Sequence, residues 1–185
     1  MSTISSTERT SLPTGTWKLD QVHSSIGFSV KHVVGRFRGG FDRFDVTLDE
    51  QGLRGTTDVS SIDIDEPNLG GHLLSPDFFD AERYPELTFR SRSIAIDGDA
   101  VTIDGELTLK GVTKPVTITG SVSGPAEHLD SSSRLGLELE TVVDRREFGL
   151  EWNAPLPTGG FVLGNDVKLT AELELFQSTD VDVAS

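Results

Sequence analysis

Apolar and polar residues alternate along much of the chain, with the period of two that is typical of β-strands having one buried face. The alternation is clearest over residues 167–175, where Val, Leu and Ala at odd positions are separated by Lys, Thr and Glu. It recurs over residues 135–143 and 101–109. We therefore predict half-buried strands in these three segments.

Turn signals divide the chain into about eight such strands. Asp97-Gly98 separates two strand-like runs and is typical of a tight hairpin. The turn over residues 110–115 leads into a third run, so these three strands should form a meander. Gly39-Gly40 indicates a bulge. The predicted strands are 26–34, 36–50, 53–64, 87–96, 101–110, 116–122, 133–144 and 165–176.

One segment, residues 66–84, breaks this rhythm. Asn68 is a helix-capping residue, and Ser75-Pro76-Asp77 combines an N-cap with proline at the first helical position. We predict one or two short helices here. Eight strands of one-sided polarity with few helices favour an all-β fold, either an antiparallel barrel or a two-sheet sandwich.

The charge and residue composition exclude several function classes. With 30 Asp and Glu against 16 Lys and Arg, the formal net charge is −14. Such a chain is repelled by phosphate backbones and anionic lipid surfaces, which argues against nucleic-acid binding and stable membrane association. No Cys is present to form a disulfide or a thiolate metal site.

No motif of an enzyme or a metal site is found. The four histidines are scattered without the short spacing of metal ligands, and no Gly-x-Ser-x-Gly nucleophile elbow occurs. We therefore expect no catalytic residues, no metal and no cofactor, and we predict that the protein is not an enzyme.

The two ends of the chain are polar. Residues 1–15 lack the basic, apolar and small-residue order of a secretory signal, and no run of 18 apolar residues occurs anywhere. We expect disordered tails over 1–15 and 177–185, a single domain over 16–176, and a cytoplasmic location.

Small residues interrupt the apolar rows near the middle of five strands. They are Ser91, Gly105, Gly120, Thr141 and Ala171. If these positions are level in a closed barrel, they leave the interior underfilled, and eight strands enclose room for one narrow ligand. Alternatively, small and large residues alternate only to fit the taper of the barrel.

A few polar and aromatic residues are candidates for contact with such a ligand. His32 continues the apolar row of its strand, so it should point inward, either as a satisfied core residue or toward the polar end of a ligand. Arg36 and Arg38 could bind a diphosphate near a mouth, or simply be solvated. Phe78 and Phe79 could close one end or belong to the core.

Two motifs in this order identify a known family. The chain has His72-Leu73-Leu74-Ser75-Pro76-Asp77-Phe78-Phe79-Asp80, and later Gly111-Val112-Thr113-Lys114-Pro115-Val116. Trp17, Asp20 and His23-Ser24 precede them, and Asp144-Arg145 with Phe148-Gly149 follow. Over residues 16–176 the sequence resembles the YceI-like family. It departs from many members at Asn68-Leu69-Gly70-Gly71 and in its polar first residues, where many members carry a secretory signal.

The resemblance implies a lipocalin-like, eight-stranded antiparallel barrel that binds a polyisoprenoid lipid, such as an isoprenoid quinone or a prenyl diphosphate. We expect the protein to sequester or carry this lipid without catalysis, with His32 and Arg36 at the head group. The remaining predicted ligand-binding residues are Phe28, Val30, Phe78, Phe79, Phe89, Gly105, Leu107, Leu109, Gly120, Leu139, Phe148 and Leu173.

Two alternatives remain open at this stage. The protein could be an enzyme acting on an isoprenoid-type amphiphile, with the inward histidine as acid or base. It could also be a stress-response structural protein whose barrel is filled. The family resemblance makes a homodimer reasonable.

Overall fold

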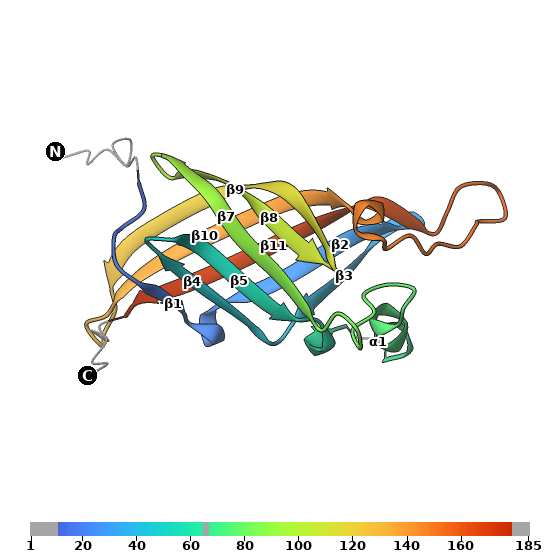
Figure 1. Cartoon of the computed structure of the whole chain (residues 1–185), viewed down its shortest axis with the longest axis horizontal. Coiled ribbons are helices and arrows are strands. Elements are labelled where there is room, and N and C mark those ends of the chain that lie inside the picture. The colour runs from blue at the N-terminus through green and yellow to red at the C-terminus, as the bar shows by residue number, and fades with distance from the viewer. Residues whose placement is uncertain (1–10, 65–66, 179–185) are drawn as a thin grey trace.

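In the computed structural model, antiparallel strands close into one barrel, and residues 11–64 and 67–178 are described (Figure 1). The strands are β1 (Trp17–Leu19), β2 (Ser25–His32), β3 (Gly35–Phe41), β4 (Phe44–Asp49), β5 (Gly52–Asp58), β6 (Ile62–Asp63), β7 (Glu86–Asp97), β8 (Ala100–Leu109), β9 (Val112–Glu127), β10 (Ser133–Asp144) and β11 (Leu163–Gln177). The helical elements are η2 (Gln21–His23), η3 (Val59–Ser61), α1 (Pro67–Leu74) and η4 (Arg145–Phe148).

The wall of the barrel has eight positions. Its hydrogen-bonded order is β1-β4-β5-β7-β8-β9-β10-β11, and it closes where β1 pairs with β11. β1 and β2 are separated by the turn η2, and both pair with β11. On their other side, β4 pairs with β1 and β3 pairs with β2. The predicted all-β, eight-stranded antiparallel barrel with a short helical insertion is thus confirmed.

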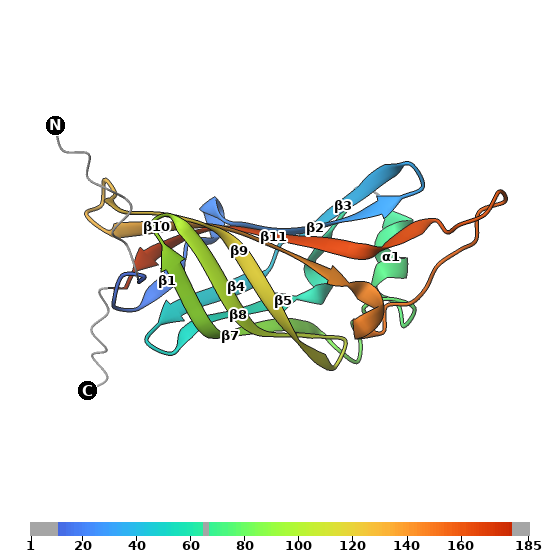
Figure 2. The ribbon, with the colours of Figure 1, turned by 90° about the horizontal axis from the view of Figure 1, so that it is seen from above.

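The wall of the barrel is closed at one end and opens between β3 and β5 at the other. β5 pairs with β4 and β7, whereas β3 pairs only with β2 and with the short strand β6. Helix α1 lies at the end that opens, together with the β2–β3 hairpin and the loop that precedes β11 (Figures 1 and 2). We call the two ends the closed end and the open end.

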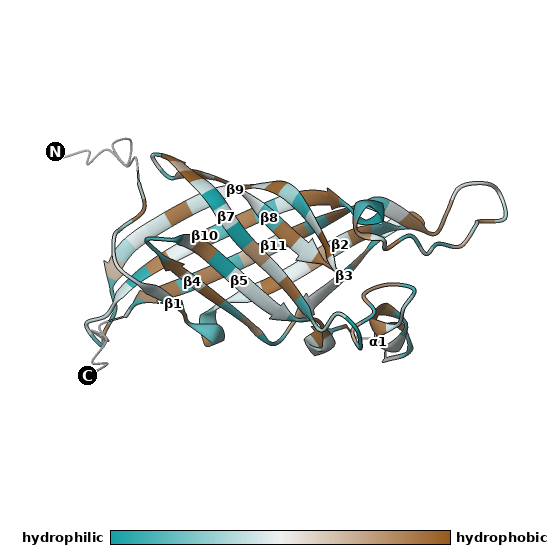
Figure 3. Ribbon diagram, viewed as in Figure 1, coloured by the Kyte–Doolittle hydropathy of each residue, from teal (hydrophilic) through white to brown (hydrophobic). Residues whose placement is uncertain are grey.

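The apolar residues form two core clusters that follow this division. At the closed end, Trp17, Ile103, Leu135 and Leu175 are almost inaccessible to solvent. The second cluster, at the open end, is rich in phenylalanine and includes Leu73 of α1. Apolar and polar positions alternate along the strands, as Figure 3 shows, and this is the period of two expected when one face is buried.

The predicted meander is confirmed, because β7, β8 and β9 pair in succession with tight turns between them. Lys110 and Gly111 both have positive φ, at 52° and 75°, as a hairpin of this type requires. The predicted bulge at Gly39-Gly40 is wrong, since β2 and β3 stay in register there. Gly39 instead makes room for a ring: a Cβ at this position would lie 2.6 Å from Cζ of Phe28.

Two predicted strands are interrupted, and one helix forms where one or two short helices were predicted. The strand predicted over 53–64 breaks into η3 because the Asp58 carboxylate accepts a hydrogen bond from the backbone N–H of Ser60. The strand predicted over 36–50 is interrupted between β3 and β4. After α1, the Ser75 carbonyl accepts from Phe78 and Asp80 in a series of turns rather than a helix.

The chain ends bear on the predicted domain limits. Residues 1–10 and 179–185 of the predicted tails lie outside the described residues. Residues 11–15 lie against the closed end, where Leu12 packs on the core and the Thr14 carbonyl accepts a hydrogen bond from Nε1 of Trp17. In residues 11–64 and 67–178, no helix combines the length and apolar character needed to cross a membrane.

Candidate functional site

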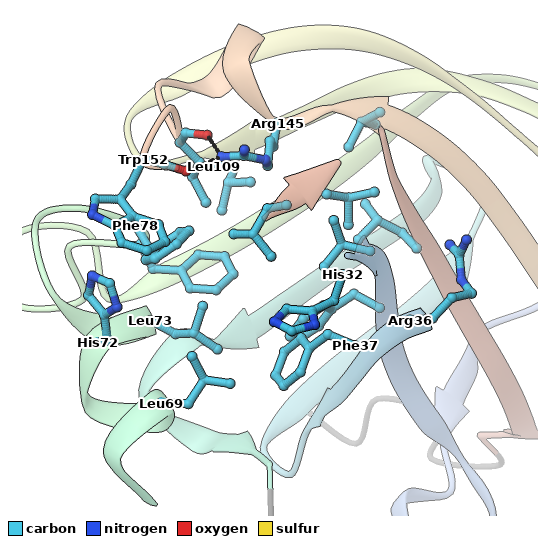
Figure 4. Close-up of a pocket in the computed structure, with 18 of the residues that line it drawn as sticks. His32, Arg36, Phe37, Leu69, His72, Leu73, Phe78, Leu109, Arg145 and Trp152 are labelled. Carbon is cyan, nitrogen blue, oxygen red and sulfur yellow. Dashed lines mark hydrogen bonds between the residues drawn. The ribbon is translucent and has the colours of Figure 1, made fainter. Parts of the chain in front are cut away.

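A cavity of about 460 Å³ occupies the open end, and its walls are almost entirely apolar. Strands β2 and β11 form one side, while α1 and the turns after it form the opposite side (Figure 4). A second cavity of about 120 Å³ lies farther into the barrel and shares Leu87 and Leu169 with the first. The main cavity is lined by Phe28, Val30, His32, Arg36, Phe37, Phe41, Leu69, His72, Leu73, Phe78, Phe79, Leu87, Leu109, Val143, Arg145, Leu150, Trp152, Val162, Leu163, Val167 and Leu169.

Aromatic rings packed against one another hold one wall of the cavity in place. Phe28 contacts Phe37 and Phe41 with ring centroids 6.0 and 5.7 Å apart, and Phe41 packs edge-on against Phe79. Such tilted and edge-to-face pairs are the preferred arrangements of aromatic rings. They link β2 and β3 to the turn after α1, so that the insertion is fixed to the barrel by apolar contact.

A second aromatic group lies where α1 meets the long loop before β11. The ring of His72 packs edge-on against Phe78 at 5.0 Å and against Trp152 at 4.7 Å. Its Nε2 lies 3.2 Å from a carboxylate oxygen of Asp77. His72 and Trp152 were not among the predicted site residues. A single aromatic ring in a short helix or in a loop is too weak a signal to identify a site.

Among the described residues that line the cavity, Arg145 is the only charged side chain that is buried. It is only 5% exposed. Its Nε donates to the carbonyl of Gly164 at 2.8 Å, and Nη1 donates to those of Leu150 and Trp152 at 2.5 and 2.9 Å. These bonds tie the loop before β11 to the end of β10 (Figure 4).

The charge of Arg145 is only partly compensated. Burial lowers the pKa of the guanidinium, because a cation loses hydration inside the protein. The neighbouring Asp144 carboxylate pairs with Arg146 at 2.7 Å. Within the described part of the chain, Nη2 of Arg145 has no hydrogen-bond partner, so two of its five N–H donors are available at the cavity wall.

The predicted site residues divide into three groups. Phe28, Val30, His32, Arg36, Phe78, Phe79 and Leu109 line the main cavity, and Phe89, Leu107, Leu139 and Leu173 line the smaller one. Gly105, Gly120 and Phe148 line neither; Phe148 is a core residue that is 1% exposed.

The two glycines do not leave empty space, which corrects the prediction made from them. A Cβ on Gly105 would lie 2.6 Å from Cζ of Phe89, so the ring of Phe89 already fills that position. A Cβ on Gly120 would collide with the carbonyl oxygen of Glu138 on β10. Of the other small residues, Thr141 and Ala171 line the smaller cavity, and the Ser91 hydroxyl accepts a hydrogen bond from Leu53 N–H at 2.9 Å.

The two residues predicted for the head group lie at the mouth rather than inside. His32 is exposed, because β2 ends there and its side chain meets solvent. The guanidinium of Arg36 donates to Oγ of Ser29 at 3.1 Å and points away from the cavity (Figure 4). Arg145 was not predicted because it belongs to a run of charged residues, Asp144-Arg145-Arg146, and such runs are typical of exposed segments. In the structure, the η4 turn buries Arg145.

A cluster of possible metal ligands lies at the other end of the molecule. Ligand atoms of Asp20, His23 and Glu174 come within 4.8 Å of one another. Nη1 of Arg134 lies 2.6 Å from Asp20 and 3.2 Å from Glu174. The guanidinium therefore already supplies the positive charge that these carboxylates attract.

Comparison with known proteins places this fold in a family. The family model described as a YceI-like domain matches residues 17–175. A UPF0312 protein of Staphylococcus aureus (strain bovine RF122 / ET3-1) is 33% identical over 164 residues, which cover 84% of this chain and 94% of that protein.

Solved structures share the architecture. BcnA of Burkholderia cenocepacia superposes with a TM-score of 0.72 at 23% identity, covering 84% of this chain and 98% of BcnA. A polyisoprenoid binding domain from Saccharophagus degradans has a TM-score of 0.69 at 15% identity, over 88% and 98% of the two chains. At these identities the likeness shows the fold alone. On the match of the family model, the chain belongs to the YceI-like family.

Proposed function

We propose that this protein binds the hydrocarbon tail of a polyisoprenoid lipid in the main cavity and carries or sequesters it. The observation that carries the proposal is the cavity of about 460 Å³ with apolar walls. Empty space lined by Leu, Val and Phe does not hold ordered water and takes apolar ligands. The structural neighbour described as a polyisoprenoid binding domain supports this ligand class.

The size of the apolar effect is sufficient for such a ligand. Each methylene-sized group moved from water into the cavity contributes about 0.8 kcal/mol. A dozen groups therefore give at most about 10 kcal/mol before the cost of ordering the ligand. Affinity depends on how much of the tail is covered, and it requires no cofactor or metal.

For the head group we propose Arg145 in place of His32 and Arg36. Its free Nη2 donors suit an oxygen acceptor, either the carbonyl of a quinone or an oxygen of a diphosphate. A diphosphate would also offset the buried charge, whereas a quinone would offer only hydrogen bonds. The enzymatic alternative depended on an inward histidine, and His32 is instead exposed.

The first experiment is organic extraction of the freshly purified protein with mass spectrometry of the extract, alongside native mass spectrometry of the intact complex. A near-stoichiometric species with isoprene-unit masses supports the proposal and identifies the head group. If the extract is empty, quinones and prenyl diphosphates are added. Absence of binding to both then contradicts the proposal.

A test of the role of Arg145 requires a variant that keeps part of its hydrogen bonding to the backbone carbonyls. We compare Arg145→Lys with Arg145→Met and use His32→Ala as a mouth control. Arg145 should set head-group preference. Arg145→Met is therefore expected to lose preference between tail-matched lipids that differ in head group, while His32→Ala keeps it. If folded Arg145→Lys and Arg145→Met discriminate as wild type does, Arg145 is a structural residue only.

A further inference from the structure

We propose that the open end docks onto an anionic lipid bilayer through two loops at the cavity mouth. The first is the β2–β3 turn, Val33-Val34, and the second is the loop over residues 149–162; together we call them the mouth loops. Docking itself does not depend on what the cavity holds. Its use in lipid exchange rests on the proposed function.

The mouth loops expose apolar side chains beside the cavity. Val34 is 96% exposed and Phe161 is 63% exposed. The backbone N–H of Val33 donates to the carbonyl of Val162 at 2.9 Å, and Val162 lines the cavity. The exposed patch is therefore continuous with the cavity wall. Both loops project from the open end (Figures 1 and 2).

The β2–β3 turn uses residues that hairpin geometry disfavours. His32 pairs with Gly35, so Val33 and Val34 form a two-residue connection, and Val33 has a φ of 51°. Such turns strongly prefer Gly, Asn or Asp, because a β-branched residue with positive φ is strained. Val34 is almost fully exposed and so gives the fold almost no buried area in return, and Val33 is exposed in part. Contact of the turn with an apolar phase accounts for them.

The two segments that carry the mouth loops have a charge opposite to that of the whole chain. Residues 25–41 contain Lys31, Arg36 and Arg38 and neither Asp nor Glu, and residues 149–165 add only Glu151. The three cations are exposed. In a chain of formal net charge −14, this is a local positive surface, and an anionic bilayer attracts it while it repels the rest.

This charge distribution also determines the orientation of the docked protein and the kind of partner that the open end binds. The mouth faces the bilayer, Val34 and Phe161 enter the interface, and the acidic body limits how long the protein stays. A second copy docking through the same face would place these cations opposite one another, which is unfavourable. The observations therefore favour a lipid surface.

The test is flotation of the purified protein with vesicles of phosphatidylcholine alone or mixed with phosphatidylglycerol, over a range of salt concentrations. We expect binding to the mixed vesicles only, decreasing as salt rises. The double variant Val34→Ser/Phe161→Ser should lower the bound fraction on the order of tenfold. Lys31→Gln/Arg38→Gln leaves only Arg36 of the three cations, so it should lower binding to the mixed vesicles and weaken the dependence on salt.

Controls are taken from the closed end. Leu129→Ser removes a side chain that is 98% exposed in the β9–β10 loop, and Lys18→Gln removes a cation of β1. Both should bind vesicles as wild type does. Absence of wild-type binding, equal binding to both vesicle types, or equal losses in these controls would overturn the proposal. So would concentration-dependent dimerisation that the Val34→Ser/Phe161→Ser variant abolishes.

The cavity variant Val167→Trp separates this proposal from the proposed function. Val167 lines the cavity but belongs to neither mouth loop. If the protein does not bind isoprenoids, vesicle docking should still occur in wild type and in Val167→Trp. If docking is wrong, isoprenoid binding in wild type should still be measurable.

Discussion

Arg134 and three neighbouring residues form an ion-pair network at the closed end. Its Nη1 contacts the carboxylates of Asp20 and Glu174, and Nδ1 of His23 lies 2.9 Å from Asp20. The hydrogen bond with Asp20 is the main cause of the raised pKa of His23. The hydrogen bond with His23 is, in turn, the main cause of the lowered pKa of Asp20.

These two shifts predict a pH window for stability. A raised His23 pKa contributes stability below its ordinary value of 6.5, and this is lost as pH rises through the folded pKa. A lowered Asp20 pKa contributes above 3.8 and is lost as pH falls through the folded pKa. In thermal melts, His23→Gln should therefore lower the melting temperature relative to wild type more between pH 3.8 and pH 6.5 than at alkaline pH.

His32→Gln is the control for that experiment, since His32 takes part in no ion pair among the described residues. A deficit of His23→Gln that is constant with pH would contradict the network. The sequence could predict His23 and Asp20 as family residues. It could not predict their charge pairing, because Arg134 and Glu174 come from strands far away in the chain.

At the scale of strands, Gly120 allows β9 and β10 to approach closely. It pairs with Leu139, and a Cβ there would collide with the carbonyl of Glu138. Gly120→Ala should destabilise the protein by about 1–3 kcal/mol, since the backbone must shift. Gly136→Ala on β10 is the matched control, because the nearest atom, Cβ of Ser123, would be 3.6 Å away.

Denaturant unfolding of both glycine variants measures the difference. Gly136→Ala should be near neutral or slightly stabilising, because alanine reduces the freedom of the unfolded chain. Equal stabilities would mean that β9 and β10 do not approach as closely as described. The prediction from sequence, that Gly120 opens a cavity, was wrong because the space beside a glycine is decided by the neighbouring strand.

At the scale of the whole molecule, a substitution in the cavity at the open end should change ligand retention without changing stability. Val167→Trp should fill part of the cavity and lower the amount of lipid that purifies with the protein. Its melting temperature should stay close to that of wild type, since the indole enters space that is already open. Mass spectrometry of extracts measures the first effect, and thermal melts measure the second.

Asp166→Trp is the paired control, because Asp166 is an exposed neighbour on the same strand and lines neither cavity. It should retain lipid as wild type does. Unchanged retention in Val167→Trp would place the ligand elsewhere than in the main cavity.

Most of the strands, their turns and the apolar face of each could be predicted from the sequence alone, because a period of two and tight-turn residues are local properties of the chain. The sequence also identified seven of the 21 residues that line the main cavity, among them Phe28, Val30 and Leu109. The filling of the space beside Gly105 by Phe89 and the burial of Arg145 became evident only in the folded chain. Both depend on how neighbouring strands, turns and loops pack against one another, because filled volume and desolvation are properties of the assembled structure.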